Sequence, residues 1–418
     1  MKIHRTLPPA AAPIALGDVL KGLTGVSGDE RHLKRLEDEL RAYFGVKHVF
    51  LLSSGKAALT IILEALKTLS DRTKVVIPAY TCFSVPSAIV KAGLHVDICD
   101  VDPQSLDFNE DQLKSVVEDS PLCIVPTHLF GKSVDIERVT RLCHKRGIFV
   151  VEDAAQAMGG RRGSKLLGTL GDVGFFSLAR GKNLTCGSGG IIVTNSDAIA
   201  GAITPLYEKL HSDRLVRTMT NLCEVLLMGW LIHPWWYWLP AGLPFLKLGE
   251  TKFSTDFETR RMDSIRARLL VSWRRRLESA NHLRSHAVAA FLSLIPSSLK
   301  GIQLSTCHES PNIRLPLLLE TKEAKEELCR QSKVLGLGIS AAYPNAVSAI
   351  PELQGQLKDR TCQGAMVLAE RLVTLPVHQF VTDRDRRRII DAVYNVSRVV
   401  NNPIKMPSMP RIVSSSSI

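Results

Sequence analysis

The sequence has few aromatic residues and no paired cysteines. Aromatic side chains make up 6% of its 418 residues, and its nine cysteines stand singly, without a CxxC pair. This pattern excludes a disulfide framework and a zinc-ribbon site, and we expect no resident metal. The first residues lack the pattern of a secretory signal, so we expect reduced thiols and a cytoplasmic location.

Acidic residues are also scarce relative to basic ones. The 41 Asp and Glu are outnumbered by 53 Lys and Arg, which gives a formal net charge of +12. The excess favours an anionic partner, such as a phosphorylated substrate or an acidic membrane surface. No nucleic-acid-binding motif accompanies it, so we expect no DNA or RNA partner. The 45% apolar and 22% charged residues exclude collagen-like, coiled-coil and wholly disordered chains.

Short runs rich in Val and Ile recur along the first half of the chain, several of them separated by helix-length spacers. They cover residues 47–52, 74–80, 95–102, 122–128, 148–154, 173–179 and 189–194. The pattern predicts an α/β fold with a mainly parallel sheet covered by helices, and one hairpin formed by the last two runs across a short turn. In such a sheet, ligands bind at the carboxyl ends of the strands.

The composition also indicates how the chain divides. We expect an N-terminal arm over residues 1–28, a large domain over 29–265, a smaller C-terminal α+β domain over 266–402 and a disordered tail over 403–418. The large domain contains an insert at about 204–258, which holds four of the five tryptophans.

The Trp-rich part of this insert, residues 222–248, is long enough for one bilayer span, but Glu224, His233 and three prolines argue against a clean span. Clustered Trp and Tyr suit a segment lying in the headgroup layer, and the Arg-rich stretch 260–284 suits anionic lipid. The alternatives are an apolar insert packed in the core or a dimer interface and, for the Arg-rich stretch, a solvated helix face.

The first motif with candidate chemistry is the turn formed by Ser54, Gly55 and Lys56. It follows a predicted strand and begins a helix. Free N–H groups and the helix dipole favour a phosphate at such a position. The alternative is an ordinary helix cap.

The second motif is VVEDAAQAMGG, in which Asp153 ends a Val-rich strand and Gln156 follows three residues later. A carboxylate buried there needs a cationic or hydrogen-bonding partner, because burying it alone is costly. The alternative is a structural Asp that caps the following turn.

The third and fourth motifs supply a hydroxyl, an amine and an imidazole. Ser177 ends a strand, and Lys182 follows in a loop before a Gly-rich turn, where desolvation would make its amine nucleophilic. His128 ends another strand in PTHLFGK. A solvated Lys and a core His are the alternatives.

Together these motifs match what pyridoxal phosphate requires from a protein: a phosphate cradle, an acid for the ring nitrogen and a Lys that forms a Schiff base with the aldehyde. The combination is more specific than any one of its members. We therefore predict pyridoxal 5'-phosphate as the cofactor.

The same segments resemble a known family. From about Ala42 to Thr194 they include FGVKHVFLLSSGKAAL, VVIPAYTCFSVPSAIVKAG, PTHLFG, VVEDAAQAMGG, GDVGFFSLARGKN and GSGGIIVTN, with fainter resemblance at 257–269, 338–344 and 375–393. The sequence is similar to the DegT–StrS sugar aminotransferases, which are fold type I pyridoxal-phosphate enzymes. The resemblance implies that fold, with a mainly parallel sheet in a large domain and a smaller C-terminal α+β domain.

The resemblance also implies roles for individual residues. Lys182 would be the Schiff-base lysine and Asp153 the partner of the pyridine nitrogen. Gln156 would hydrogen-bond the ring oxygen. The phosphate would be held by Ser177, by the Ser54 turn and by the backbone of Gly55 and Lys56. Family members are usually homodimers with each site at the subunit interface.

Two departures from the family concern the cofactor ring and phosphate. Lys56 stands where the family often has Thr or Ser, so a hydroxyl contact to the phosphate is lost while a positive charge remains. Cys82 occupies the position of an aromatic residue that usually stacks on the ring. We expect Phe83 or His128 to cover the ring there.

A third departure concerns the neighbouring subunit. In the family a motif like NYRM supplies an Asn to the partner's phosphate, whereas this chain has Thr259, Arg260, Arg261 and Met262. We expect Arg260 or Arg261 to take over that contact, with Arg261 as the preferred candidate.

The resemblance implies an aminotransferase that moves an amino group from an amino acid, typically glutamate, to a keto-sugar. A nucleotide or lipid would carry this sugar, in polysaccharide or cell-envelope glycan synthesis. Other readings are a dehydratase or an acyl-transfer enzyme on the same fold, or a non-catalytic membrane-associated protein. The family's dehydratases tend to have another residue at the Lys182 position, so Lys182 favours transamination. We expect a cytoplasmic enzyme, peripheral at the inner face of the membrane.

Overall fold

The computed structural model describes residues 5–14, 17–19, 30–211, 229–243, 251–295, 311–357 and 361–401, together with 220, 223 and 225–227. Parts of the expected N-terminal arm and of the Trp-rich segment, and the whole expected tail over 403–418, lie outside the described residues. The domain boundaries therefore stay predictions.

The large sheet is built from the strands β1 (His48–Leu52), β2 (Lys74–Pro78), β3 (His95–Cys99), β4 (Cys123–Ile124), β5 (Phe149–Asp153), β8 (Val173–Ser177) and β9 (Gly190–Thr194). Their order is β1-β9-β8-β5-β4-β2-β3. The strands from β8 to β3 are parallel, whereas β9 is antiparallel to both β8 and β1. This confirms the predicted α/β class and the antiparallel pair. The expected short turn is instead the loop 178–189.

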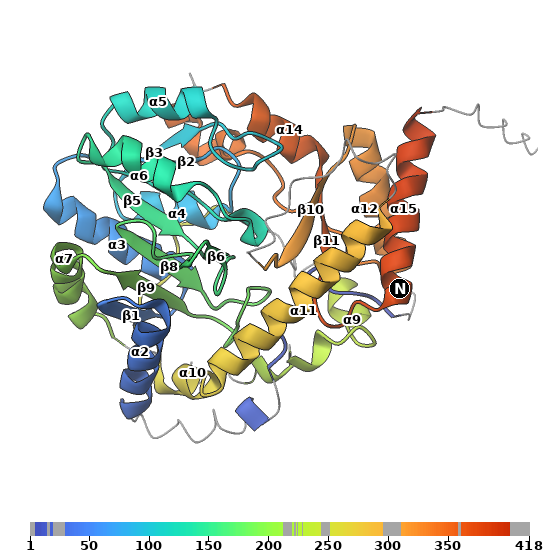
Figure 1. Ribbon diagram of the computed structural model, residues 1–418, viewed down its shortest axis with the longest axis horizontal. Helices are drawn as coiled ribbons and strands as arrows, with labels where there is room; N and C mark the ends of the chain where they lie inside the picture. The colour runs from blue at the N-terminus through green and yellow to red at the C-terminus, as the bar shows by residue number, and fades with distance from the viewer. Residues whose placement is uncertain are drawn as a thin grey trace, which may run out of the picture.

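Helices cover both faces of this sheet (Figure 1). They are α2 (Arg31–Phe44), α3 (Gly55–Leu69), α4 (Ser84–Lys91), α5 (Glu110–Glu118), α6 (Ile136–His144), α7 (Asp197–Glu208), α10 (Ser264–Leu269) and α11 (Trp273–Leu294). Because successive strand residues point to opposite faces, Phe175 packs in the cluster with α3, α4 and α7, and Phe176 in the cluster with α2 and α10.

A second, two-stranded antiparallel sheet pairs β10 (Arg314–Leu318) with β11 (Leu372–Pro376). Its helices are α12 (Lys322–Leu335), α13 (Gln354–Leu357), α14 (Gln363–Arg371) and α15 (Asp383–Asn401). The long helix α11 joins the two parts: Trp273 and Leu277 pack under the large sheet, whereas Phe291 packs against the second sheet (Figure 1). The N-terminal arm reaches the same place, because Leu7 is buried beside Phe291.

The remaining short elements are β6 (Arg161–Arg162), β7 (Lys165–Leu166), α9 (Trp238–Ala241) and the 3-10 turns Leu129–Gly131, Val347–Ala349 and Pro351–Leu353. The Trp-rich segment is anchored where the Thr6 N–H donates to the Pro234 carbonyl over 2.8 Å. Of the helices that the structure describes, none has both the length and the apolar character to cross a membrane.

Candidate active site

Three strand ends meet at one edge of the large sheet. Asp153 ends β5 and Ser177 ends β8, and these strands are parallel neighbours. Strand β1 runs in the same direction as β8, because both are antiparallel to β9. The start of α3, just after β1, therefore lies at the same edge as Asp153 and Ser177.

The start of α3 forms a cradle suited to an anion. The Ser54 hydroxyl caps the helix by accepting the Ala57 N–H at 3.1 Å. A Cβ added to Gly55 would come within 2.9 Å of the Ser177 Cβ, so only glycine permits this close approach. The Ser177 hydroxyl is thereby held beside the positive end of the helix dipole, where an anion is stabilised.

Asp153 is a buried acid, with 4% of its surface exposed. Burial raises the pKa of its carboxyl group. The Ala155 N–H, which donates to Oδ1 at 3.0 Å, opposes that shift, as do the positive charge of Lys182 and the Thr127 hydroxyl. Because burial outweighs these partners, one more positive or N–H group beside the carboxylate would stabilise its charged form.

Lys182 lies in the loop 178–189 and supplies the amine. Its side chain keeps some solvent exposure. The surrounding protein nevertheless lowers the pKa of the amine by desolvation, although Cys82 and Asp153 favour the charged form and Arg314 opposes it. A Lys with a lowered pKa is more often neutral, which is the form that reacts with an aldehyde or accepts a proton.

Gln156 connects this edge to the second part of the molecule. Its Oε1 accepts the Phe130 N–H at 3.2 Å, and its Nε2 donates to the Tyr343 hydroxyl at 2.9 Å. Tyr343 in turn stacks against Phe130, with ring centroids 6.1 Å apart. The predicted site residue Gln156 is therefore held between the two sheets.

Two of the predicted positions, Cys82 and Lys56, lie close to each other, and Cys82 also lies within electrostatic reach of the Lys182 amine. The Cys82 side chain raises the pKa of both lysine amines, against the larger effect of desolvation. Its Sγ lies 3.1 Å from the Ser84 hydroxyl. The Lys56 ammonium lies 4.3 Å from the ring centroid of Phe257, and burial lowers its pKa.

The prediction for His128 is wrong. Its side chain is fully buried, so it offers no surface to a cofactor ring. Nδ1 accepts the Val134 N–H at 3.2 Å, and Nε2 lies 2.8 Å from Oε1 of Glu152. The alternative reading, a satisfied core histidine, describes it. Phe83 is likewise buried in the core.

Arg261, predicted to contact the phosphate in the partner subunit's site, has contacts within its own chain, and its role at a partner's site stays a prediction. Its guanidinium donates to the Tyr207 carbonyl at 2.9 Å and to the Glu208 carbonyl at 2.6 Å. These are the last carbonyls of α7, and the negative end of a helix dipole attracts a cation. Arg260 pairs with Glu258 at 2.7 Å. Both side chains have local partners that the sequence motif did not indicate.

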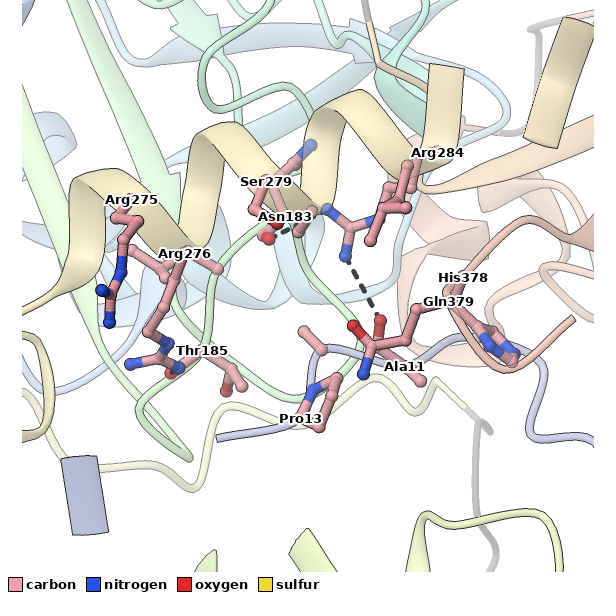
Figure 2. A pocket seen from close by; sticks show the side chains of 14 residues that line it. Ala11, Pro13, Asn183, Thr185, Arg275, Arg276, Ser279, Arg284, His378 and Gln379 are labelled. Carbon is pink, nitrogen blue, oxygen red and sulfur yellow. Dashed lines mark hydrogen bonds between the residues drawn. The ribbon is translucent and has the colours of Figure 1, made fainter. Parts of the chain in front are cut away.

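A cavity of about 250 Å³ is lined by Asn183, Leu184 and Thr185, which follow Lys182 in its loop, and by residues of α11 (Figure 2). Arg276 and Arg284 point from α11 towards it, so the Arg-rich stretch is not one solvated face. The buried Arg284 donates to the Lys182 carbonyl at 3.1 Å, the Asn183 carbonyl at 2.9 Å and the Ala11 carbonyl at 3.3 Å. Arg284 therefore fixes the backbone that carries the amine.

Sequence reasoning missed Arg284, Arg314 and Tyr343. Each lies well beyond the motifs in the sequence, and neither the Arg-rich stretch around Arg284 nor the faint resemblance around Tyr343 indicated that these side chains lie near Lys182 or Gln156. For Glu152 a signal existed, because the same VVED run places two acids in a buried strand.

The assembled groups fit pyridoxal phosphate. An anion cradle at Gly55 and Ser177, a buried acid with spare hydrogen-bonding capacity and a desolvated amine match the cofactor's phosphate, ring nitrogen and aldehyde. The fit rests on these groups alone and not on the ring-stacking position.

Comparisons with known proteins agree with this site. GDP-perosamine synthase of Vibrio cholerae is 30% identical over 210 residues, which are 48% of this chain and 57% of that protein. The chain spans about half the length of such curated relatives.

Solved structures share the fold. PseC of Helicobacter pylori, an aminotransferase involved in pseudoaminic acid biosynthesis, superposes with a TM-score of 0.74 at 16% identity, covering 94% of this chain and 99% of that one. NtdA of Bacillus subtilis, solved with the cofactor PMP, superposes with a TM-score of 0.72 at 18% sequence identity. The superposition covers 92% of this chain and 83% of that one. The model of the DegT/DnrJ/EryC1/StrS aminotransferase family matches residues 15–394, and the chain belongs to that family.

Proposed function

We propose that this protein is a pyridoxal-phosphate-dependent aminotransferase that moves an amino group from glutamate to a keto-sugar carried on a nucleotide or a lipid, in glycan biosynthesis. One observation carries the proposal: a desolvated Lys182 amine lies within electrostatic reach of the buried Asp153, in a member of an aminotransferase family. The sugar class is supported by the relative named for GDP-perosamine synthesis.

Each residue has a defined task in this proposal. The N–H groups of Gly55 and Lys56 and the Ser177 hydroxyl hold the phosphate, and Asp153 keeps a proton on the ring nitrogen. When bound, the cofactor draws electrons from the α-carbon of the donor. The neutral Nζ of Lys182 accepts the proton that leaves this carbon, and it later returns a proton as a general acid.

The visible absorption spectrum of the purified protein tests the proposal. We expect a cofactor band that disappears when L-glutamate is added and returns with 2-oxoglutarate. A band that glutamate leaves unchanged would point to another donor or to a dehydratase or acyl-transfer reaction. If no band formed even after addition of pyridoxal phosphate, the non-catalytic reading would replace this proposal.

The proposal includes a homodimer, as the resemblance implies, in which the segment before α10 reaches the partner's site. Residues 251–260 contain no helix or strand, and four of them, Lys252, Thr255, Asp256 and Glu258, are exposed. Light scattering would show twice the mass of the 418-residue chain. A monomer that retains full activity would contradict a shared site.

We also propose that the enzyme works in the cytoplasm on the inner face of an anionic membrane, docked through a Trp-rich patch. This patch consists of exposed large side chains: Leu226, Leu227, Trp230, Trp235, Trp236 and Leu239. Trp235 is 61% exposed, and Trp230 and Trp236 stack with centroids 4.7 Å apart. Trp favours the membrane interface, and the net charge of +12 favours acidic lipid.

Co-sedimentation with vesicles tests this docking. We expect binding to vesicles that contain phosphatidylserine and weak binding to neutral ones. The double variant Trp235→Ser, Trp236→Ser should lose binding, whereas Val334→Ser, at another exposed apolar residue, should keep it. If the intact protein ignored acidic vesicles, or if dimerisation buried the patch, the docking proposal would fail.

A further inference from the structure

Arg314 is a cation beside the amine that the proposed mechanism does not use. It is the first residue of β10, next to Ile313, whose N–H donates to the Phe130 carbonyl at 2.9 Å. Phe130 is the residue that binds Gln156. The charge of Arg314 acts on the pKa of Lys182, so the guanidinium lies within electrostatic reach of the amine.

Among the residues that the structure describes, the neighbours of Arg314 include no acid to balance its charge. Its Nη1 donates to the Ser340 hydroxyl at 3.1 Å. Burial lowers the pKa of its guanidinium, and the groups that oppose this shift are the hydroxyls of Tyr343 and Tyr237. Within the described residues no carboxylate pairs with it.

Two other buried arginines show what is usual in this molecule. Arg266 forms an ion pair with Asp263 at 2.6 Å. Arg284 donates to three backbone carbonyls and to the Asn281 side chain. Arg314 has five N–H groups like them, but a single neutral acceptor. Some of its surface remains accessible to solvent, so its spare donors are open to a ligand.

We propose that Arg314 binds the α-carboxylate of the amino donor. This inference rests on the proposed function, because it assumes that an amino acid reacts at Lys182. The α-carboxylate is attached to the carbon that carries the transferred nitrogen, so it must lie close to the amine. A phosphate on a sugar substrate is separated from the keto carbon by atoms of the sugar ring, which places it farther away.

The chemistry of the cluster suits a carboxylate. A guanidinium presents two parallel N–H groups that match the two carboxylate oxygens, and a lysine at this position would not reproduce that fork. Two tyrosine hydroxyls, of Tyr343 and Tyr237, lie within electrostatic reach of Arg314. The Tyr343 hydroxyl accepts a hydrogen bond from the Gln156 amide at 2.9 Å. Tyr237 comes from the Trp-rich segment, so the segment also contributes to the donor site.

The variant Arg314→Gln tests the assignment through the reaction of the cofactor-loaded dimer with two amines. L-Glutamate has an α-carboxylate, and 4-aminobutyrate is glutamate without it. We expect KM for glutamate to rise about 10- to 100-fold, because a charge-assisted hydrogen bond is lost, while the reaction with 4-aminobutyrate changes less than about twofold. Arg314→Lys should recover part of the loss, and Arg274→Gln, an exposed control, should behave as wild type.

A binding measurement separates this inference from the proposed function. Succinate, a dicarboxylate without an amino group, is titrated into the loaded wild-type and Arg314→Gln proteins by calorimetry. We expect the variant to bind it about tenfold or more weakly. Added guanidinium ion should restore part of the glutamate reaction in Arg314→Ala.

The outcomes are distinct. If wild type does not react with glutamate but binds succinate through Arg314, the proposed donor is wrong and the carboxylate site stands. If Arg314→Gln binds succinate as wild type does, or slows glutamate and 4-aminobutyrate equally, Arg314 is not the carboxylate receptor.

Discussion

Strand β5 ends with two consecutive acids that have opposite surroundings. Glu152 is fully buried, and its carboxylate accepts N–H groups from Gly168 at 2.6 Å, Leu170 at 2.7 Å and Gly171 at 3.1 Å, besides the His128 contact at 2.8 Å. Asp153 points to the other face of the sheet, and burial raises its pKa because its partners do not offset desolvation.

The difference shows how the same chemical group becomes structural or reactive. The pairs Glu152–His128 and Asp153–Lys182 each combine an acid and a base in the interior. The first pair uses both carboxylate oxygens and both ring nitrogens within the protein, so nothing remains for a ligand. The second retains unused capacity and perturbed pKa values, which is typical of a functional site.

The largest expected effect comes from removing the amine of the second pair. Lys182→Ala should lower kcat by about 10,000-fold or more, since both covalent attachment of the cofactor and proton transfer are lost. Its thermal stability should not fall, because burying a desolvated amine is costly. Stopped-flow spectra and a melting curve measure the two effects. Transamination at the normal rate in this variant would refute the role of Lys182.

The next effect concerns the acid of the second pair. Asp153→Asn keeps the shape but removes the charge that would hold a proton on the ring nitrogen, so kcat should fall about 100- to 1000-fold. The folded protein should lose little stability, because burial already disfavours the charged carboxylate that the substitution removes. Steady-state kinetics with glutamate measure the loss. Normal kinetics in this variant would mean that another group protonates the ring.

The fold could be predicted because its signals are local. Each Val-rich run became a strand, since such runs can only be buried between two helical layers. The order of the strands could not be predicted, because sequence spacing does not say that β9 inserts between β1 and β8. The connection between the last two runs was expected to be a short turn because the runs stand close together in the sequence, whereas the structure has the loop 178–189, which carries Lys182.

The candidate site was predictable where a residue and its partner stand in the same motif or at strand ends on the same edge of the sheet, as Gly55 and Ser177 do. The prediction failed for His128, because the surroundings of its ring depend on Glu152, which comes from another strand. Arg314 was not predicted, because an unpaired charge is recognisable only when its surroundings are known.

A substitution in the first pair should show the opposite pattern from Asp153→Asn. In Glu152→Gln an amide N–H₂ replaces one of the oxygens that accept N–H groups, so donors face donors. We expect a loss of about 3 kcal/mol in the free energy of unfolding. Activity per folded molecule should remain within about twofold of wild type, because Glu152 faces away from Lys182. Urea denaturation measures the free energy of unfolding, and kinetics normalised to the cofactor-loaded protein measure the activity. A large loss of kcat at unchanged stability would contradict the structural role assigned to Glu152.

The smallest effect extends the comparison to a buried imidazole without an acid. In His378, Nε2 lies 2.8 Å from the Pro8 carbonyl oxygen, and Nδ1 accepts the Phe380 N–H. Burial lowers its pKa from 6.5 to about 4. Above pH 6.5 the imidazole is neutral in both the folded and the unfolded chain, so it does not make stability depend on pH. As the pH falls below 6.5, the unfolded chain takes up the proton first, and stability is lost until the folded pKa is reached.

This linkage amounts to about 2 kcal/mol at pH 5. His378→Gln keeps one donor and one acceptor but does not titrate, so its free energy of unfolding should change about 2 kcal/mol less than that of wild type between pH 7 and pH 5. Urea denaturation across this range measures the difference. Equal pH slopes in wild type and His378→Gln would show that a buried imidazole tolerates its charge in this fold even without a carboxylate.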